Sequence, residues 1–235
     1  MDDGAYSQRD QGGGGDEPAS TSGFDGFAAS PLDLGADDFQ LLKRALLNER
    51  MAPEVLAYKE QLVERVKSAL QRQEADLELL ERQKEADVAR GIAGYEADRL
   101  RFLLKAYLRA RLDKIQAHAG FILHEARVRA RLSQAEQLFV QQVFVAAGRG
   151  LKASVLDHVP PAYASLVKRY DAESDNTLLV GPDTAGYVFA HVLDDCGQVP
   201  DGPDGQTAEL RAGDMMVVKY STVAALVEAG RVCLV

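Results

Sequence analysis

The sequence predicts an α+β protein, with a mainly helical N-terminal bundle followed by a small β-rich C-terminal domain. Between residues 37 and 158 proline occurs once, and apolar residues recur at helical spacing. After residue 187 the pattern changes to short β-prone runs separated by turn signals. The expected segments are a disordered acidic Gly-rich tail at 1–36, a helical domain at 37–167, a linker at 168–186 and a small β-rich domain at 187–235.

The tail carries most of the net charge. The whole chain of 235 residues has a formal charge of −9, and residues 1–40 hold nine acidic residues and one basic residue. The rest of the chain is therefore nearly neutral. So little apolar surface cannot offset the entropy of ordering, which predicts disorder. Phe24, Phe27 and Leu32 stand among acids, which suits either a docking motif that orders on a partner or a solvated arm.

The start of the helical segment carries two local signals. Pro53, followed by Glu54, predicts that a helix begins at this point. The apolar residues after it repeat every seven positions, but Lys59 and Gln73 interrupt the matching row, which favours a bundle helix over a free coiled coil. The repeat consists of Leu56, Val63, Leu70 and Leu77.

Three further signals divide the helical segment. Gly91 and Gly94 predict a joint or kink. Ser133 followed three residues later by Glu136 predicts a capping box at the start of another helix. The run Val-Pro-Pro at 159–161 predicts the end of the helical region.

The C-terminal segment is predicted to hold three strands and one helix. The strands are expected at 187–193, 215–220 and 232–235, and the helix at 223–229. The glycines and prolines of 196–206 predict a loop. The last strand is expected to pair with the strand at 215–220.

The most informative stretch is RLRFLLKAYLRARLDKI at 99–115. Projected as a helix, its apolar residues cover one broad face, and Arg111 falls near the centre of that face. A buried arginine is costly unless a carboxylate or carbonyl meets it. Charged and apolar residues are mixed, unlike the segregated faces of a membrane-surface helix, and the nearly neutral body argues against sequence-specific nucleic-acid binding. The pattern predicts a helix covered on several sides by other helices, which either all belong to this chain, as around a core helix with paired arginines, or belong in part to other chains.

No catalytic or metal-binding constellation emerges. His118 and His124 are six residues apart, which is not a helical metal spacing, and no phosphate-loop or GxSxG motif occurs in the sequence. Cys196 and Cys233 are expected to be reduced, buried thiols. No apolar run approaches the ~20 residues of a membrane span. The sequence predicts no enzyme, no cofactor and no metal.

Several stretches resemble one known family. The string at 99–115 resembles the signature helix of the Sld-five family of the GINS DNA replication complex (GINS subunit four). The similarity extends to LLNERMAPEVL at 46–56, LKASVLDHVPP at 151–161, Tyr-Val-Phe at 187–189 and VVKYSTVAALVEAGRVCLV at 217–235. These stretches occur in the family's order.

The resemblance implies a non-catalytic scaffold subunit of the nuclear replicative helicase. The implied partners are three other GINS subunits, the minichromosome maintenance hexamer, the Cdc-forty-five protein, DNA polymerase epsilon and, through the tail, a replisome adaptor. The residues that align with the signature, as candidates for structural or partner contacts, are Arg99, Arg101, Tyr107, Arg109, Arg111 and Lys114. A free-standing helical or coiled-coil adaptor unrelated to replication is the main alternative, and an enzyme with an unrecognised site is a third.

Overall fold

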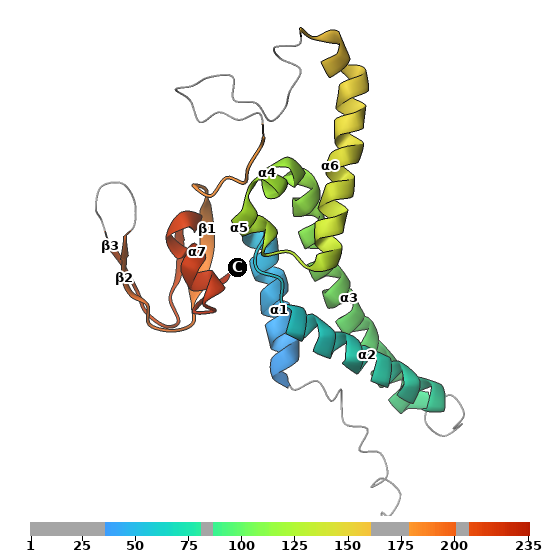
Figure 1. Ribbon diagram of the computed structural model, residues 1–235. Helices are drawn as coiled ribbons and strands as arrows, with labels where there is room; N and C mark the ends of the chain where they lie inside the picture. The colour runs from blue at the N-terminus through green and yellow to red at the C-terminus, as the bar shows by residue number, and fades with distance from the viewer. Residues whose placement is uncertain (1–35, 81–86, 161–178, 201–206) are drawn as a thin grey trace, which may run out of the picture. The chain divides into compact units, whose positions relative to one another are not determined.

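The computed structural model describes residues 36–80, 87–160, 179–200 and 207–235 (Figure 1). In the first two of these stretches the chain is helical, and in the last two it forms strands and one helix. The helical elements are α1 (Ala36–Met51), α2 (Glu60–Leu80), α3 (Asp87–Ala117), α4 (Ala119–His124), α5 (Ala126–Arg129), α6 (Gln134–Ser154) and η1 (Leu156–His158). The later elements are β1 (Tyr187–Val192), β2 (Gly197–Pro200), β3 (Thr207–Leu210), β4 (Met215–Lys219), α7 (Tyr220–Glu228) and β5 (Val232–Leu234). The predicted α+β class is confirmed.

Two apolar cores hold the helices together. The first joins α1, α2 and α3, and α2 runs alongside α3 (Figure 1). Val63 and Leu70 of the predicted repeat are buried in this core, whereas Leu56 precedes α2 and packs elsewhere. The second core joins the end of α3 to α4 and α6 through residues such as Ile115 and Val140.

The segment 52–59, between α1 and α2, is not helical, so the predicted helix start at Pro53 is wrong. Side chains from other elements form hydrogen bonds with backbone groups of this segment. The carbonyl of Leu56 accepts a hydrogen bond from Arg111 Nη1 at 2.7 Å, and the Leu56 amide donates to Glu49 Oε1 at 3.4 Å. These bonds satisfy the backbone without a helix.

The helical signals further along the chain fare differently. Gly91 and Gly94 both lie inside the continuous helix α3, so a joint between two helices is wrong, whereas the alternative of a kink stays a prediction. The predicted capping box is confirmed: the Ser133 hydroxyl accepts from the Glu136 amide at 3.3 Å, and the Glu136 carboxylate accepts from the Ser133 amide at 2.8 Å. Because this signal needs only four consecutive residues, distant contacts do not override it.

The three predicted strands are confirmed, but one pairing and one loop differ from expectation. The sheet has the order β4-β1-β5 with antiparallel neighbours, so β5 pairs with β1 and not with β4. Residues 197–200, predicted as loop, form β2 and pair with β3 in a separate two-stranded sheet. Helix α7 begins at Tyr220, three residues earlier than expected, and Gly230 at φ +75° turns the chain back into β5.

One face of the small sheet is covered by α7 and by the segment after α1. Ala52 and Leu56 lie in the same apolar core as Val218, Val223 and Leu234. The linker is predicted at 168–186; its start lies among residues 161–178, outside the described residues, and its end lies directly before β1, so the linker stays a prediction.

Candidate functional site

A fully buried arginine lies at the centre of the helical part. Arg111 has no exposed surface, and its guanidinium donates to Glu136 Oε1 and Oε2 at 2.7 and 3.0 Å and to Glu49 Oε2 at 3.0 Å. It also donates to the carbonyls of Leu56 at 2.7 Å and Arg131 at 3.2 Å. The cluster therefore ties α1, α3, α6 and two connecting segments to one side chain. The expectation that carboxylates or carbonyls must meet Arg111 is confirmed.

Lys114 completes this charged cluster. Its Nζ donates to Glu49 Oε1 at 3.2 Å, so two cations face the carboxylates of Glu49 and Glu136. Burial works against the charge of Arg111, but its bonds to Glu136 and the charge of Glu49 outweigh burial and raise the Arg111 pKa. Burial lowers the pKa of Lys114 and raises that of neighbouring Tyr107 to about 12. The cluster is neutral overall and fully hydrogen-bonded, which are the conditions under which buried charge is tolerated.

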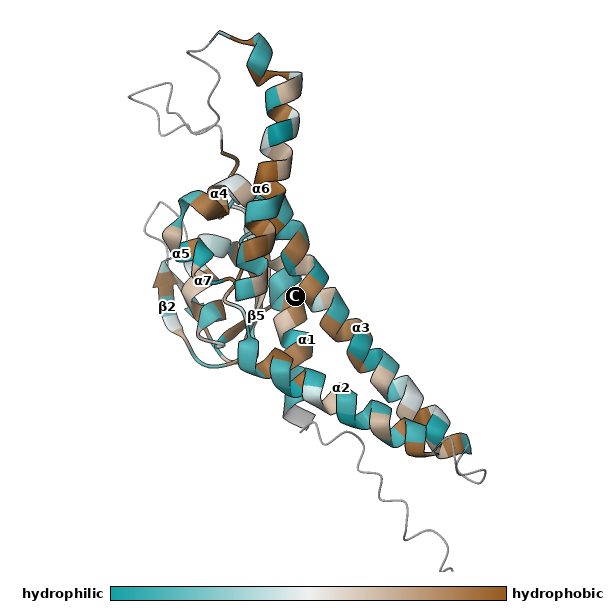
Figure 2. Ribbon diagram, turned by 45° about the vertical axis from the view of Figure 1, so that its right-hand side comes forward, coloured by the Kyte–Doolittle hydropathy of each residue, from teal (hydrophilic) through white to brown (hydrophobic). Residues whose placement is uncertain are grey.

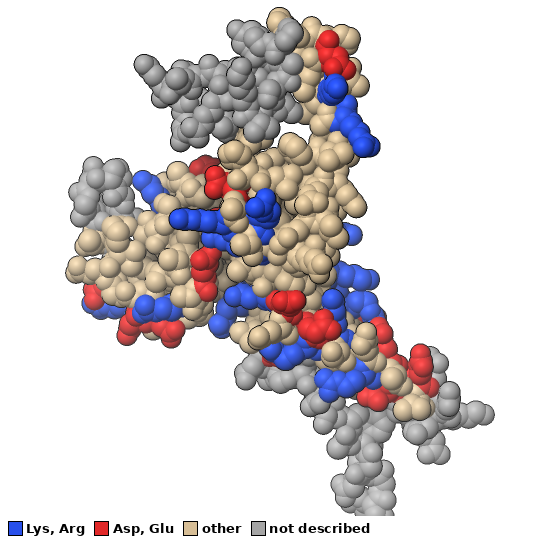
Figure 3. All heavy atoms as spheres, in the orientation of Figure 1, with Lys and Arg blue, Asp and Glu red and all other residues tan. Residues whose placement is uncertain are grey.

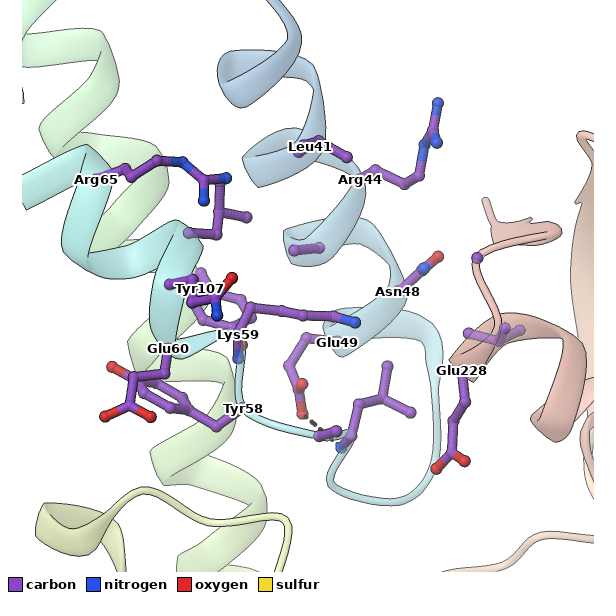
Figure 4. A pocket seen from close by; sticks show the side chains of 17 residues that line it. Leu41, Arg44, Asn48, Glu49, Tyr58, Lys59, Glu60, Arg65, Tyr107 and Glu228 are labelled. Carbon is purple, nitrogen blue, oxygen red and sulfur yellow. Dashed lines mark hydrogen bonds between the residues drawn. The ribbon is translucent and has the colours of Figure 1, made fainter. Parts of the chain in front are cut away.

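A pocket of about 540 Å³ opens beside this cluster, between α1, the start of α2 and the end of α7. Figure 4 shows the Lys59 side chain crossing it towards α1, with Glu49 below and Glu228 on the opposite side. Its lining holds charges of both signs and two tyrosines, Tyr58 and Tyr107, but no histidine, cysteine or serine. The lining therefore offers no Ser–His or Cys–His pair of the kind that activates a hydroxyl or thiol nucleophile.

The remaining signature residues lie on the outside. Arg101 pairs with Glu74 at 2.5 Å and with Asp98, which ties α3 to α2. Arg99 stands 4.7 Å from the ring centroid of Phe39 on α1. Arg109 is exposed, and in the described part of the chain no acidic residue pairs with it. The signature thus mixes interior residues with exposed ones, and whether the exposed ones face a partner stays a prediction.

Helix α3 carries a second apolar stripe, opposite its buried one, that the sequence analysis missed. Val88, Ile92, Tyr95 and Phe102 are between 58 and 79% exposed. Their spacing places them on one face, together with Arg99 and Arg109, about half a turn from Leu100 and Arg111. A helical projection started at residue 87 instead of 99 reveals this stripe from sequence alone.

Helix α6 shows the same property on its outer face. Leu138 and Val145, seven residues apart on this face, are 58 and 48% exposed, whereas Val140 is buried. Leu151, 42% exposed, lies near the end of α6 on the side of Val140 and not on the outer face. Figure 2 shows apolar and polar residues interspersed along α3 and α6. Figure 3 shows positive and negative side chains mixed over the visible face of the helices, with no extended patch of one sign on that face. The exposed features favour protein contacts over a nucleic-acid backbone.

The described residues hold neither a cluster of metal ligands nor a membrane-spanning helix. No group of three or more His, Cys, Asp or Glu that could hold a metal occurs among them. Among the helices described here, none combines the length and apolarity needed to cross a membrane. The possible docking residues Phe24, Phe27 and Leu32 lie outside the described residues.

Comparison with known proteins covers both parts of the fold. Residues 56–150 match the family model described as "GINS complex protein helical bundle domain", and residues 182–235 match "DNA replication complex GINS protein SLD5 C-terminus". A human protein named DNA replication complex GINS protein SLD5 is 30% identical over 92% of this chain and 95% of its own length. This chain belongs to the SLD5 family of GINS proteins.

Other SLD5 relatives give similar values. The Arabidopsis thaliana protein is 29% identical over 92% of this chain and all of its own length, and the Schizosaccharomyces pombe protein is 26% identical over 90% and 98%. Within the SLD5 models, Arg111 and Glu136 fall in the helical bundle match and the whole three-stranded sheet falls in the C-terminal match. Glu49 precedes the helical bundle match, although it contacts Arg111 directly.

Proposed function

We propose that this SLD5-family chain is a non-catalytic subunit of a heterotetrameric GINS complex and acts in DNA replication. The observation that carries the proposal is the match over about nine-tenths of the chain to relatives from plants, animals and fungi, all named DNA replication complex GINS proteins. The proposal includes three sister GINS subunits, a nuclear location and a scaffold role beside the minichromosome maintenance hexamer and the Cdc-forty-five protein. Contact with DNA polymerase epsilon and recruitment of a replisome adaptor by the tail belong to the same proposal.

The chemistry of the helices supports assembly. The apolar stripe of α3 and the outer face of α6 expose large side chains that single chains usually cover. Permanent interfaces bury on the order of 2,000 Å² or more and resemble a domain core cut in half. Partner helices laid on both faces would provide such cover.

Co-expression tests the assembly. The chain produced with three sister subunits should co-purify with them at equal stoichiometry, while the chain produced alone should self-associate without a defined size. Size exclusion with light scattering measures both. A well-behaved monomer with cooperative unfolding, or a stable homodimer, contradicts the proposal, and the homodimer favours a free-standing adaptor.

Variants of the α3 stripe test which surface is used. Tyr95→Ser combined with Phe102→Ser should lower recovery of the complex by about tenfold or more, because aromatic side chains dominate permanent interfaces. Lys105→Ser, an exposed polar change at the border of the stripe on the same helix, is the matched control, because it alters the same surface without removing an apolar side chain. Circular dichroism of the recovered complexes checks that α3 still forms. Equal recovery of both variants would remove the stripe from the interface.

A further inference from the structure

One face of the small sheet is uncovered over β1 and β4 in the described part of the chain, whereas at β5 the same face is covered, because Cys233 opposite His191 is buried. β1 and β4 pair with Tyr187 opposite Lys219, Phe189 opposite Val217 and His191 opposite Met215, so these side chains share a face. The sheet's other face packs against α7. Tyr187, Phe189 and Met215 are 67, 66 and 69% exposed, and Val217 is 52% exposed. We call these four residues the open sheet face.

Strand β4, which carries Met215 and Val217 of the open sheet face, also has a free edge. β4 is the outer strand of the order β4-β1-β5. The Val192 amide donates to the Asp214 carbonyl at 2.9 Å, and the Tyr220 amide donates to the Gly186 carbonyl at 2.9 Å. These two bonds fix the alternation of the ladder, so Met216 and Val218 turn their backbone groups towards β1.

The residues between them turn their backbone groups away from the sheet. These are Met215, Val217 and Lys219. Among the described residues, their three amides and the carbonyls of Met215 and Val217 have no hydrogen-bond partner, whereas the Lys219 carbonyl caps the start of α7. Edge strands are normally protected by charge, bulges or proline, yet the first four residues of β4 are Met-Met-Val-Val. The open sheet face and the free edge therefore meet along one strand.

We propose that an extended segment of a sister GINS subunit adds as a further strand to the β4 edge and covers the open sheet face. The segment carries apolar side chains at alternate positions, because only alternate residues reach that face. It also carries a carboxylate near Lys219, the cation that stands 6.0 Å from the Tyr187 ring centroid and that no described carboxylate pairs with. This inference rests on the proposed function, because it takes the partner from the complex.

The size of the surface favours a segment over a second whole chain. Side chains of this kind at these exposures offer roughly 500 Å² of apolar area, against about 800 Å² on each side of a standard interface. An added strand makes up the difference through main-chain hydrogen bonds, which a second globular surface does not make with a free edge. A permanently exposed apolar edge promotes aggregation. The added strand therefore comes from a permanent subunit of the complex and not from a transient binding partner.

Residue-resolved hydrogen exchange on the purified complex tests the strand directly. The amides of Val217 and Lys219 should exchange as slowly as those of Met216 and Val218, which already bond to β1. Exchange of Val217 and Lys219 at the rate of free amides, beside protected neighbours, overturns the inference. Failure of the complex to form at all refutes the proposed function instead, so the two failures are distinguishable. Equal protection in the chain purified alone identifies a second copy as the occupant and also overturns it.

Two variants add an independent readout. Val217→Lys places a charge on the open sheet face and should lower recovery of the complex, whereas Val180→Lys, at a valine 73% exposed outside the sheet, should not. Val217→Pro removes only an outward amide and should abolish the protection of Lys219 while leaving the Val218 amide protected. Unchanged recovery with Val217→Lys, or unchanged Lys219 protection with Val217→Pro, contradicts strand addition.

Discussion

The charged cluster around Arg111 and the core of the small sheet are both closed to solvent, but by opposite chemistry. The cluster consists of two cations, two carboxylates and the carbonyls of connecting segments, each meeting a partner. The sheet core consists of aliphatic side chains and one tyrosine hydroxyl, that of Tyr220, which donates to Glu54 at 2.9 Å. Leu56 belongs to both, because its carbonyl accepts from Arg111 while its side chain packs in the sheet core. The comparison teaches that burial follows from available partners as much as from residue type.

A charge placed in the sheet core should have the largest effect. Leu234 has no exposed surface and no cation near enough to meet a carboxylate among the contacts of its core. Leu234→Asp should therefore cost more than about 4 kcal/mol and unfold the small sheet, while the helices persist. Limited proteolysis of residues 187–235, with circular dichroism for the helices, measures this. Val235→Asp, at a neighbouring residue 44% exposed, should leave the sheet resistant.

Removal of the central cation should have the next largest effect. Arg111→Ala leaves Glu49 and Glu136 buried without their main partner and should cost about 3–5 kcal/mol. Lys105→Ala, an exposed change six residues earlier on α3, should cost well under about 1 kcal/mol. Thermal melting of the two complexes under identical conditions compares them. Similar melting temperatures would show that the cluster is not required for stability.

The two regions should also differ in their response to alkali, through Tyr107 of the cluster. Burial raises its pKa to about 12 from the ordinary tyrosine value of 10.0, so above pH 10 the unfolded chain binds fewer protons than the folded one. Stability is therefore lost as the pH rises from 10 to 12, by about 1.4 kcal/mol at pH 11 for this group. Tyr107→Phe should remove that loss. Denaturant unfolding at pH 8 and pH 11 gives the comparison, and parallel curves for variant and parent would contradict it.

The smallest expected effect comes from the capping box that adjoins the cluster. Ser133→Ala removes the acceptor for the Glu136 amide but leaves the Glu136 carboxylate on Arg111, so it should cost about 1 kcal/mol. Ser154→Ala, at the last residue of α6, should have a smaller effect because its hydroxyl bonds a carbonyl within the same helix. Melting of the two variants measures the difference. A loss as large as that of Arg111→Ala would mean that the cap, and not the arginine, organises the cluster.

The contrast also explains what the sequence could reveal. The helical projection predicted that a carboxylate or carbonyl must meet Arg111, because it placed this arginine in the middle of the apolar face of its helix. It could not supply the identity of the partners, since Glu49 and Glu136 lie 62 and 25 residues away. The same long-range bonds overturned the helix start expected at Pro53. The capping box was predictable because its donors and acceptors lie within four residues.

The sheet was predictable in its parts and not in its order. Each strand run is β-prone over a few residues, but pairing depends on which strand lies in the middle, and β1 takes that place. β2 was missed because its first and last residues are Gly197 and Pro200, and these residue types are typical of turns. The open sheet face escaped notice because exposure on one face becomes visible only when the other face is known to be covered.

Strand β5 holds a built-in reporter of its own detachment. Cys233 is 8% exposed, and burial raises the pKa of its thiol, so little thiolate is available to an alkylating reagent at neutral pH. Modification of Cys233 therefore requires that β5 separate from the elements that cover this side chain, α1 among them, and under reversible opening the rate of labelling reports the population of that open state. In a Cys196→Ser background Cys233 is the single thiol of the chain. The labelling rate then measures the opening equilibrium of this one strand without unfolding the rest of the molecule.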